Sequence, residues 1–104
     1  MGVEWTSKAF EVSKETKERI ESGEHYYVDM EQGGILFDDQ IPSFIQQVRE
    51  DYKDYYGDLS DEEILNECNV VDYDNSDDWG YWLGGSYFYI TQSGDIVYII
   101  NYAY

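Results

Sequence analysis

Residues 50–78 form a dense block of negative charge, and this block limits how the chain can fold. Twelve of its 29 residues are acidic and only Lys53 is basic, so the block carries −11 of the chain's net charge of −17 at pH 7. A small domain usually carries a net charge of magnitude about 2–8 with both signs interspersed. Excess charge of one sign opposes compaction through self-repulsion, and it attracts cations and basic proteins. The block therefore predicts a charged surface for a basic partner.

The rest of the composition predicts one folded domain over residues 1–104. The chain contains 12 Tyr, 3 Trp and 4 Phe, and apolar runs such as Ile96–Ile100 make sense only if they are buried. A single cysteine, Cys68, excludes an internal disulfide framework and fits a reducing compartment. No apolar run reaches the roughly 18 residues of a membrane span, and residues 1–10 lack the core of a signal peptide, so we expect a cytoplasmic protein. An isoelectric point of about 4.1 argues against direct binding to nucleic acid or to anionic membranes.

Local signals predict a helix and a hairpin in the N-terminal part. Residues 3–12 are compatible with a short strand or an irregular segment. Ser13 is suited to cap a polar surface helix over Lys14–Glu21 that Gly23 ends. The β-rich runs His25–Met30 and Gly34–Phe37 flank a turn signal, with either Gln32-Gly33 or Gly33-Gly34 at its centre.

Two helices are expected next, joined by a short link. Apolar residues at helical spacing predict a helix over Pro42–Tyr56, with Gly57 in the left-handed conformation after its end. Ser60 and Glu63 form a capping-box pattern for a second helix, which we expect to end near Cys68-Asn69. A strand starting at Val70-Val71 and an acidic loop over Asp72–Trp79 would follow.

The C-terminal part predicts a hairpin of two long strands, Tyr81–Thr91 and Ile96–Tyr104. If Ser93-Gly94 forms a two-residue turn, Tyr89 faces Tyr98. Alternation then creates one tyrosine-rich face, which holds Tyr81, Tyr87, Tyr89, Tyr98, Tyr102 and Tyr104. The opposite, aliphatic face would pack on the Pro42–Tyr56 helix through Phe88, Ile90, Val97 and Ile99. The expected fold is therefore α+β, with antiparallel sheet from the N-terminal and C-terminal hairpins packed on two central helices, plus a short N-terminal helix.

Signals for catalysis are weak, and we predict neither an enzyme nor a cofactor. His25 is the only histidine and has no nucleophile motif beside it. Cys68 lies in acidic surroundings, which do not favour a reactive thiolate. Asp72 and Asp74 occupy the first two acidic positions of a calcium loop, but the Gly and Glu that such a loop needs later are absent. We therefore predict no metal site, while a weak cation site at Asp72–Asp78 stays open.

The acidic block breaks local rules in a way that favours a function. Glu50, Asp51 and Asp54 lie in the C-terminal half of the predicted helix, where the helix dipole disfavours acids. Glu50–Asp54 and Glu63–Glu67 are like-charge pairs at i, i+4, each costing about 0.2–0.5 kcal/mol. Such conflicts are expected at functional sites. A row of carboxylates one helical turn apart imitates the dense line of charge along a nucleic-acid backbone. The predicted partner-binding residues are Glu50, Asp51, Asp54, Tyr55, Asp58, Glu62, Glu67, Asp72, Asp74, Asp77, Asp78 and Trp79, with Tyr55 and Trp79 as aromatic anchors.

These residues predict a small inhibitor that occupies the basic groove of a nucleic-acid-binding protein or nuclease complex. In being small, strongly acidic and without catalytic motifs, the chain is similar to the phage and mobile-element proteins that block restriction or CRISPR nucleases. The similarity is to this class only, because no motif matches a particular family. It implies a nucleic-acid mimic of the anti-CRISPR or anti-restriction type, located in the host cytoplasm.

Four alternatives stay open. The chain could be an immunity protein that neutralises a basic toxin, or a non-enzymatic adaptor that binds through its tyrosine-rich sheet face. The N-terminal segment or a second copy of the chain could instead cover that face, and a second copy would give a homodimer. The last alternative is that the acidic block is an ordinary solvated surface.

Overall fold

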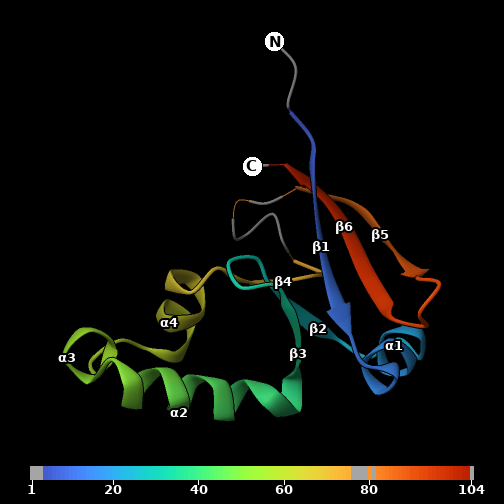
Figure 1. Ribbon diagram of the computed structural model, residues 1–104. Helices are drawn as coiled ribbons and strands as arrows, with labels where there is room; N and C mark the ends of the chain where they lie inside the picture. The colour runs from blue at the N-terminus through green and yellow to red at the C-terminus, as the bar shows by residue number, and fades with distance from the viewer. Residues whose placement is uncertain (1–3, 76–79, 81, 104) are drawn as a thin grey trace.

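A computed structural model describes residues 4–75, 80 and 82–103, and it confirms the α+β class (Figure 1). The predicted partner-binding residues Asp77, Asp78 and Trp79 lie outside the described residues, as do Tyr81 and Tyr104 of the predicted tyrosine-rich face. The elements run in the order β1 (Thr6–Val12), α1 (Lys14–Glu21), β2 (Tyr26–Asp29), β3 (Gly34–Phe37), the 3-10 turn η1 (Asp38–Gln40), α2 (Ile41–Asp51), α3 (Lys53–Tyr56), α4 (Asp61–Glu67), β4 (Val70–Asp72), β5 (Trp82–Ile90) and β6 (Ile96–Ala103).

The strands form two separate antiparallel sheets of three strands each. The outer sheet has the order β1-β6-β5, and the central sheet has the order β3-β2-β4. Figure 1 shows the outer sheet on one side of the central sheet and helices α2 to α4 on the other. The two predicted hairpins therefore belong to different sheets. The central sheet packs on helices α2 to α4, whereas α1 contacts the core between the two sheets through Ile20.

The central sheet is buried on both faces, because each face belongs to a different hydrophobic core. Tyr26, Val28, Phe37 and Val71 face the outer sheet and pack with its fully buried Tyr98 and Ile100. The alternate residues of the same strands face the helices, where Val70 packs with Ile45, Ile64 and Leu65. Successive side chains of a strand point to opposite faces, so a few short strands supply both cores.

The C-terminal hairpin is displaced by one residue from the predicted register. Phe88 pairs with Tyr98 and Tyr89 with Val97. The loop has three residues between Thr91 and Asp95, not two, and Gly94 adopts a positive φ of 88° there. A shift of one residue moves side chains to the other face of a sheet. Tyr98 is therefore buried in the core, and the predicted single tyrosine face does not exist.

The same shift overturns the predicted packing of the aliphatic face. Phe88 packs in the core between the two sheets, not on α2. Val97 and Ile99 pair with Tyr89 and Tyr87. By alternation, these residues lie on the side of the outer sheet that faces away from the central sheet.

The predicted Pro42–Tyr56 helix is interrupted. Tyr52 has φ −133° and ψ 49°, which ends α2 at Asp51 and begins the short α3 at Lys53. The interruption lets Tyr56 reach the core between the central sheet and the helices. Gly57 has φ −56°, so the predicted left-handed conformation is wrong. Glycine is needed there for space, because an added Cβ would lie 2.6 Å from the Lys53 carbonyl oxygen.

The N-terminal hairpin also has a longer turn than predicted. Asp29 and Gly34 form its last pair, which leaves four residues in the loop, and the Gly33 N–H donates to the Asp29 carbonyl at 3.0 Å. The Asp29 side chain accepts hydrogen bonds from the backbone N–H groups of Glu31 and Gln32. Other local predictions are confirmed: Ser13 caps α1, Ser60 and Glu63 form the capping box of α4, and Cys68 is the C-terminal cap of α4.

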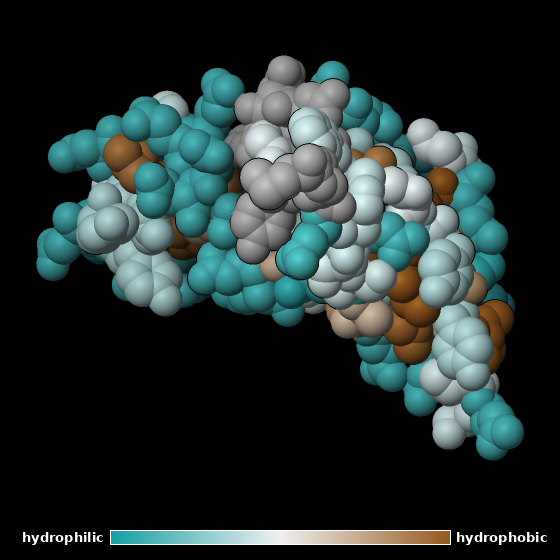
Figure 2. Space-filling model, turned by 90° about the horizontal axis from the view of Figure 1, so that it is seen from above, coloured by the Kyte–Doolittle hydropathy of each residue, from teal (hydrophilic) through white to brown (hydrophobic). Residues whose placement is uncertain are grey.

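Helices α2 to α4 project from the two sheets as a separate lobe. We call residues 41–69 the helical lobe. The radius of gyration is 14.7 Å, whereas a compact domain of this length has about 13 Å. Figure 2 shows the resulting bent outline, with mostly hydrophilic residues over the lobe.

Candidate acidic interface

The predicted site residues that the structure describes lie mainly on the helical lobe. Glu50 and Asp51 are in the last turn of α2, Asp54 and Tyr55 in α3, Asp58 in the α3–α4 link, and Glu62 and Glu67 in α4. All seven are exposed. Asp72 ends β4 and Asp74 follows it, on the adjoining part of the central sheet.

The lobe has a strong excess of negative charge. Residues 41–69 include eight acids and only two bases, Arg49 and Lys53. All eight acids are exposed. Both bases line one groove of about 400 Å³ beside α2. The positive charge of the lobe is therefore gathered in one place.

Arg49 holds the two acidic helices together. Its guanidinium donates to the Leu59 carbonyl at 2.7 Å and pairs with the Asp61 carboxylate at 2.9 Å. Leu59 and Asp61 flank the N-terminal cap of α4, so these contacts join the last turn of α2 to the first turn of α4. The acids at the end of α2 and at the start of α4 consequently share one end of the molecule.

The structure relieves one of the predicted conflicts between acids. Because the chain breaks at Tyr52, Glu50 and Asp54 belong to different helices and do not form an i, i+4 pair within one helix. Asp54 instead lies in the first turn of α3. Glu50 and Asp51 remain in the last turn of α2, where they accept hydrogen bonds from the neutral side chains of Gln46 and Gln47. Their charges are thus not neutralised by these contacts.

A second groove connects the lobe to the central sheet. It has a volume of about 600 Å³ and lies between α4 and β4. Glu62 and Glu63 line it from α4, and Asp72 lines it from β4. The fold therefore brings two predicted site residues, Glu62 and Asp72, to the same groove although ten positions separate them in the sequence.

Asp72 differs from the acids of the helical lobe because it pairs with His25. The ring nitrogens of His25 contact two carboxylates: Nδ1 lies 2.6 Å from Asp38 Oδ1, and Nε2 lies 2.8 Å from Asp72 Oδ1. Two carboxylate partners favour the doubly protonated ring. The hydrogen bond with Asp72 accordingly raises the pKa of His25, in spite of partial burial. Burial would raise the pKa of Asp72, but hydrogen bonds from His25 and Asn75 outweigh it and hold that pKa low.

The same cluster is where a cation could be coordinated. His25, Asp72 and Asp74 each offer a ligand atom, and these atoms lie within 4.8 Å of one another. The His25 ring already contacts Asp72, and the Asp74 backbone N–H donates to the same carboxylate at 3.0 Å. The raised pKa of His25 favours a protonated ring, which places positive charge next to Asp72.

Tyr55 has the exposure that an anchor residue requires. It is 71% exposed, the largest value among the large hydrophobic side chains described as exposed. Its ring meets the edge of the Tyr56 ring at a centroid distance of 4.8 Å. Tyr52, 58% exposed, also contacts Tyr56, which makes a small aromatic group beside the acids.

Sequence reasoning overlooked Trp5 as a surface residue. Trp5 lies at the start of β1, and its ring covers Gly84 of β5, where an added Cβ would come within 2.8 Å of the ring. The signal available in the sequence was a glycine pair, Gly84-Gly85, inside an otherwise aromatic strand. Such glycines mark a bulge or a close approach, and a bulge is observed between Leu83 and Gly85.

No protein-family model matches the chain, and comparisons with curated proteins and with solved structures likewise find no match. Within the described residues, none of the helices is both long enough and apolar enough to cross a membrane.

Proposed function

We propose that the protein is a small acidic inhibitor that binds the basic nucleic-acid-binding groove of a target enzyme in place of DNA or RNA. One observation supports this proposal above others. The helical lobe exposes eight acids, while its two bases are confined to one groove. An ordinary solvated surface intersperses both signs.

The contacts would follow from simple electrostatics. Exposed carboxylates on α2, α3 and α4 take the places of phosphates and meet Lys and Arg side chains of the target. Opposite charge on the two surfaces steers them together and gives fast, salt-sensitive association. Tyr55 adds an aromatic contact, because large aromatic side chains often dominate the binding energy of an interface.

On this proposal the partner is a basic nuclease or nucleic-acid-binding complex in the cytoplasm, and the protein itself catalyses nothing. It would act as a phage or mobile-element counter-defence protein of the anti-CRISPR or anti-restriction type. An immunity protein against a basic toxin would use the same surface. The position of its gene beside a toxin gene would distinguish that case.

The test compares two triple variants of equal charge. Asp51→Asn/Asp54→Asn/Asp58→Asn removes three charges from the lobe, whereas Glu15→Gln/Glu18→Gln/Asp95→Asn removes three exposed charges elsewhere. Tagged proteins are used to capture partners from a lysate of the host at about 50 mM and about 300 mM salt, with and without competing DNA. The captured nuclease is then purified, and its inhibition is titrated with each variant.

We expect the lobe variant to inhibit about tenfold less well, because three exposed ion pairs at about 0.5 kcal/mol each correspond to that factor. The control variant should inhibit like the unmodified protein. Equal inhibition by both variants would contradict this choice of surface. A captured partner that neither salt nor DNA displaces would contradict nucleic-acid mimicry itself.

A further inference from the structure

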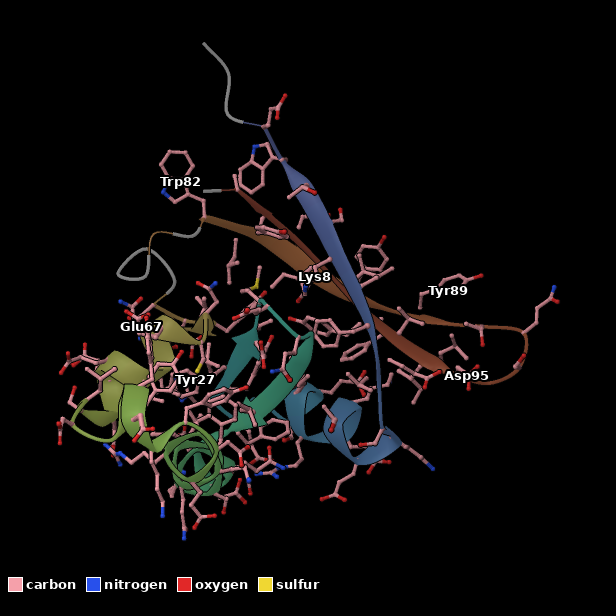
Figure 3. The ribbon with its side chains drawn as sticks, turned by 60° about the vertical axis from the view of Figure 1, so that its left-hand side comes forward. Lys8, Tyr27, Glu67, Trp82, Tyr89 and Asp95 are labelled. Atoms are coloured by element: carbon pink, nitrogen blue, oxygen red, sulfur yellow. The ribbon has the colours of Figure 1, made fainter. Side chains whose placement is uncertain are left out.

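Within the described chain, most of the outward side of the outer sheet is exposed, with the buried Ala103 at the end of β6 as an exception. Phe10, Phe88 and Tyr98 point inward to the core between the sheets. By alternation, their neighbours along the strands point outward. In Figure 3, Trp82 and Tyr89 extend away from the central sheet and from the helices. We call this outward side the aromatic face; its main residues are Trp5, Trp82, Tyr87, Tyr89, Val97 and Ile99.

The aromatic face exposes much more apolar surface than scattered side chains would. Its four aromatic residues, Trp5, Trp82, Tyr87 and Tyr89, are each 52–56% exposed. The register places Tyr87 beside Ile99 and Tyr89 beside Val97, so that the rings adjoin aliphatic side chains in one continuous patch. Apolar patches of several hundred Å² on a soluble protein mark interaction sites.

The face is also nearly free of charge. Along β1, its outward residues include Ser7, Ala9 and Glu11, opposite Asn101, Ile99 and Val97 of β6. Glu11 is the one charged residue that the register places among the paired strand positions of this face. A chain with a net charge of −17 repels its own copies over most of its surface. The aromatic face is therefore the surface through which two copies can approach with little repulsion.

The size of the face fits a weak contact between two copies. Tyr and Trp bury about 150–250 Å² each when fully covered, so four half-exposed rings offer about 300–500 Å². The partly exposed Val97 and Ile99 add to this area, whereas Ile90 lies on the same side of β5 as the inward Phe88. A standard interface buries about 800 Å² on each partner, so the face fits a smaller contact at the low end of specific interfaces.

We infer that the aromatic face is the interface of a homodimer, in which two copies pack outer sheet against outer sheet about a two-fold axis. A self-complementary patch is what such an axis requires, because the same residues serve on both sides. The helical lobe lies beyond the central sheet from this face (Figure 1), so both acidic lobes stay free. The inference does not depend on the proposed function.

The test measures the mass of the intact chain in solution by sedimentation velocity from about 1 to about 200 μM. We expect a species of twice the chain mass of 12.3 kDa. Its dissociation constant should stay equal or fall when salt is raised from about 50 to about 500 mM, because salt screens the repulsion between two acidic chains. Tyr87→Ser/Tyr89→Ser should raise the dissociation constant at least tenfold.

The matched control is Tyr52→Ser/Tyr55→Ser, which removes two equally exposed tyrosines from the helical lobe. This control should dimerise like the unmodified chain. If the Tyr87/Tyr89 variant does not fold, Tyr89→Asp tests the same point, since it places two like charges in the contact. A monomer at about 200 μM in both salts, a dimer that salt dissociates, or a dimer that only the Tyr52/Tyr55 variant disrupts would each overturn the inference.

Discussion

The bridge from His25 to Asp38 and Asp72 makes stability depend on pH in a specific direction. It joins the start of β2 to η1 through Asp38 and to β4 through Asp72. The perturbation is His25→Phe, which keeps a ring next to Tyr27, at a centroid distance of 5.2 Å, but removes both N–H donors. The contact with Asp72 is the stronger of the two, because the Asp72 side chain is only 13% exposed and that of Asp38 is 66% exposed.

The magnitude follows from the two contacts. A hydrogen bond between charged groups contributes about 1.5–3 kcal/mol when it is sheltered, and an exposed ion pair contributes less than about 1 kcal/mol. We therefore expect His25→Phe to lower the free energy of unfolding by about 2 kcal/mol at pH 6. For a domain of about 100 residues, that is a decrease of about 8–16 °C in the midpoint of thermal unfolding.

The sign of the pH dependence is fixed by the raised pKa of His25. Below about pH 6.5 the ring is protonated in the folded and the unfolded chain, so the full contribution is present. As pH rises through the folded-state pKa, the ring loses its proton and the contribution is lost. The lowered pKa of Asp72 adds stability that is present above the usual pKa of an aspartate and disappears as pH falls below it.

The assay is thermal unfolding followed by circular dichroism at pH 6 and pH 9. The deficit of His25→Phe relative to the unmodified chain should be about 2 kcal/mol at pH 6 and less than half of that at pH 9. Because the variant and the unmodified chain are compared at the same pH, the effect of titrating the other acids cancels. Asp74→Asn serves as a control that leaves the bridge intact. Since the chain has one histidine, the NMR titration of its imidazole gives the pKa directly. An equal deficit at both pH values, or a pKa at or below 6.5, would refute the reasoning.

Two further substitutions test the cores and the caps. Tyr98→Phe leaves the buried Tyr26 hydroxyl without its 3.0 Å partner and should cost about 1–3 kcal/mol in urea unfolding; the double variant with Tyr26→Phe should recover part of this loss. A change near zero would instead fit the predicted register, in which Tyr98 is on the other face. Ser60→Ala removes the cap of α4 and should cost about 1 kcal/mol, with Ser13→Ala at α1 as a comparison of the same kind. No loss in either variant would show that the capping hydrogen bonds do not contribute.

Elements with a signal inside a few residues could be predicted from the sequence. Ser60 and Glu63 fix the start of α4 because both partners of the capping box lie within one turn. Ser13 fixes the start of α1 in the same way. The strands could be located from their aromatic and β-branched residues, since those residues fit a pleated, half-buried surface.

Features that depend on one loop residue or on distant partners could not be predicted in this way. The sequence Gln92-Ser93-Gly94 fits a two-residue or a three-residue turn, and the choice decides which face Tyr98 joins. No residue at Tyr52 signals the end of a helix. The interruption there goes with the packing of Tyr56 in the core, and tertiary packing can override the local preference for a continuous helix. His25 meets Asp72 across 47 positions, and only the pairing of β2 with β4 brings them together. Of the candidate interface, the acids could be selected from charge and Tyr55 from its aromatic ring beside them, whereas the separation of Glu50 from Asp54 required the fold.

The position of β6 has a consequence for how the chain folds. β6 is the middle strand of the outer sheet, and β1 pairs with it over the full length of β1, from Thr6 with Tyr102 to Val12 with Ile96. The outer sheet therefore cannot assemble before almost all of the described chain has been synthesised. Until then, the apolar side of the central sheet, with Val28 and Phe37, lacks the cover of the outer sheet and contacts α1 only through residues such as Ile20. Contacts of such long sequence separation slow folding, and exposed apolar surface in the meantime promotes aggregation. We expect slow folding for so short a chain, and a refolding yield that falls steeply as protein concentration rises.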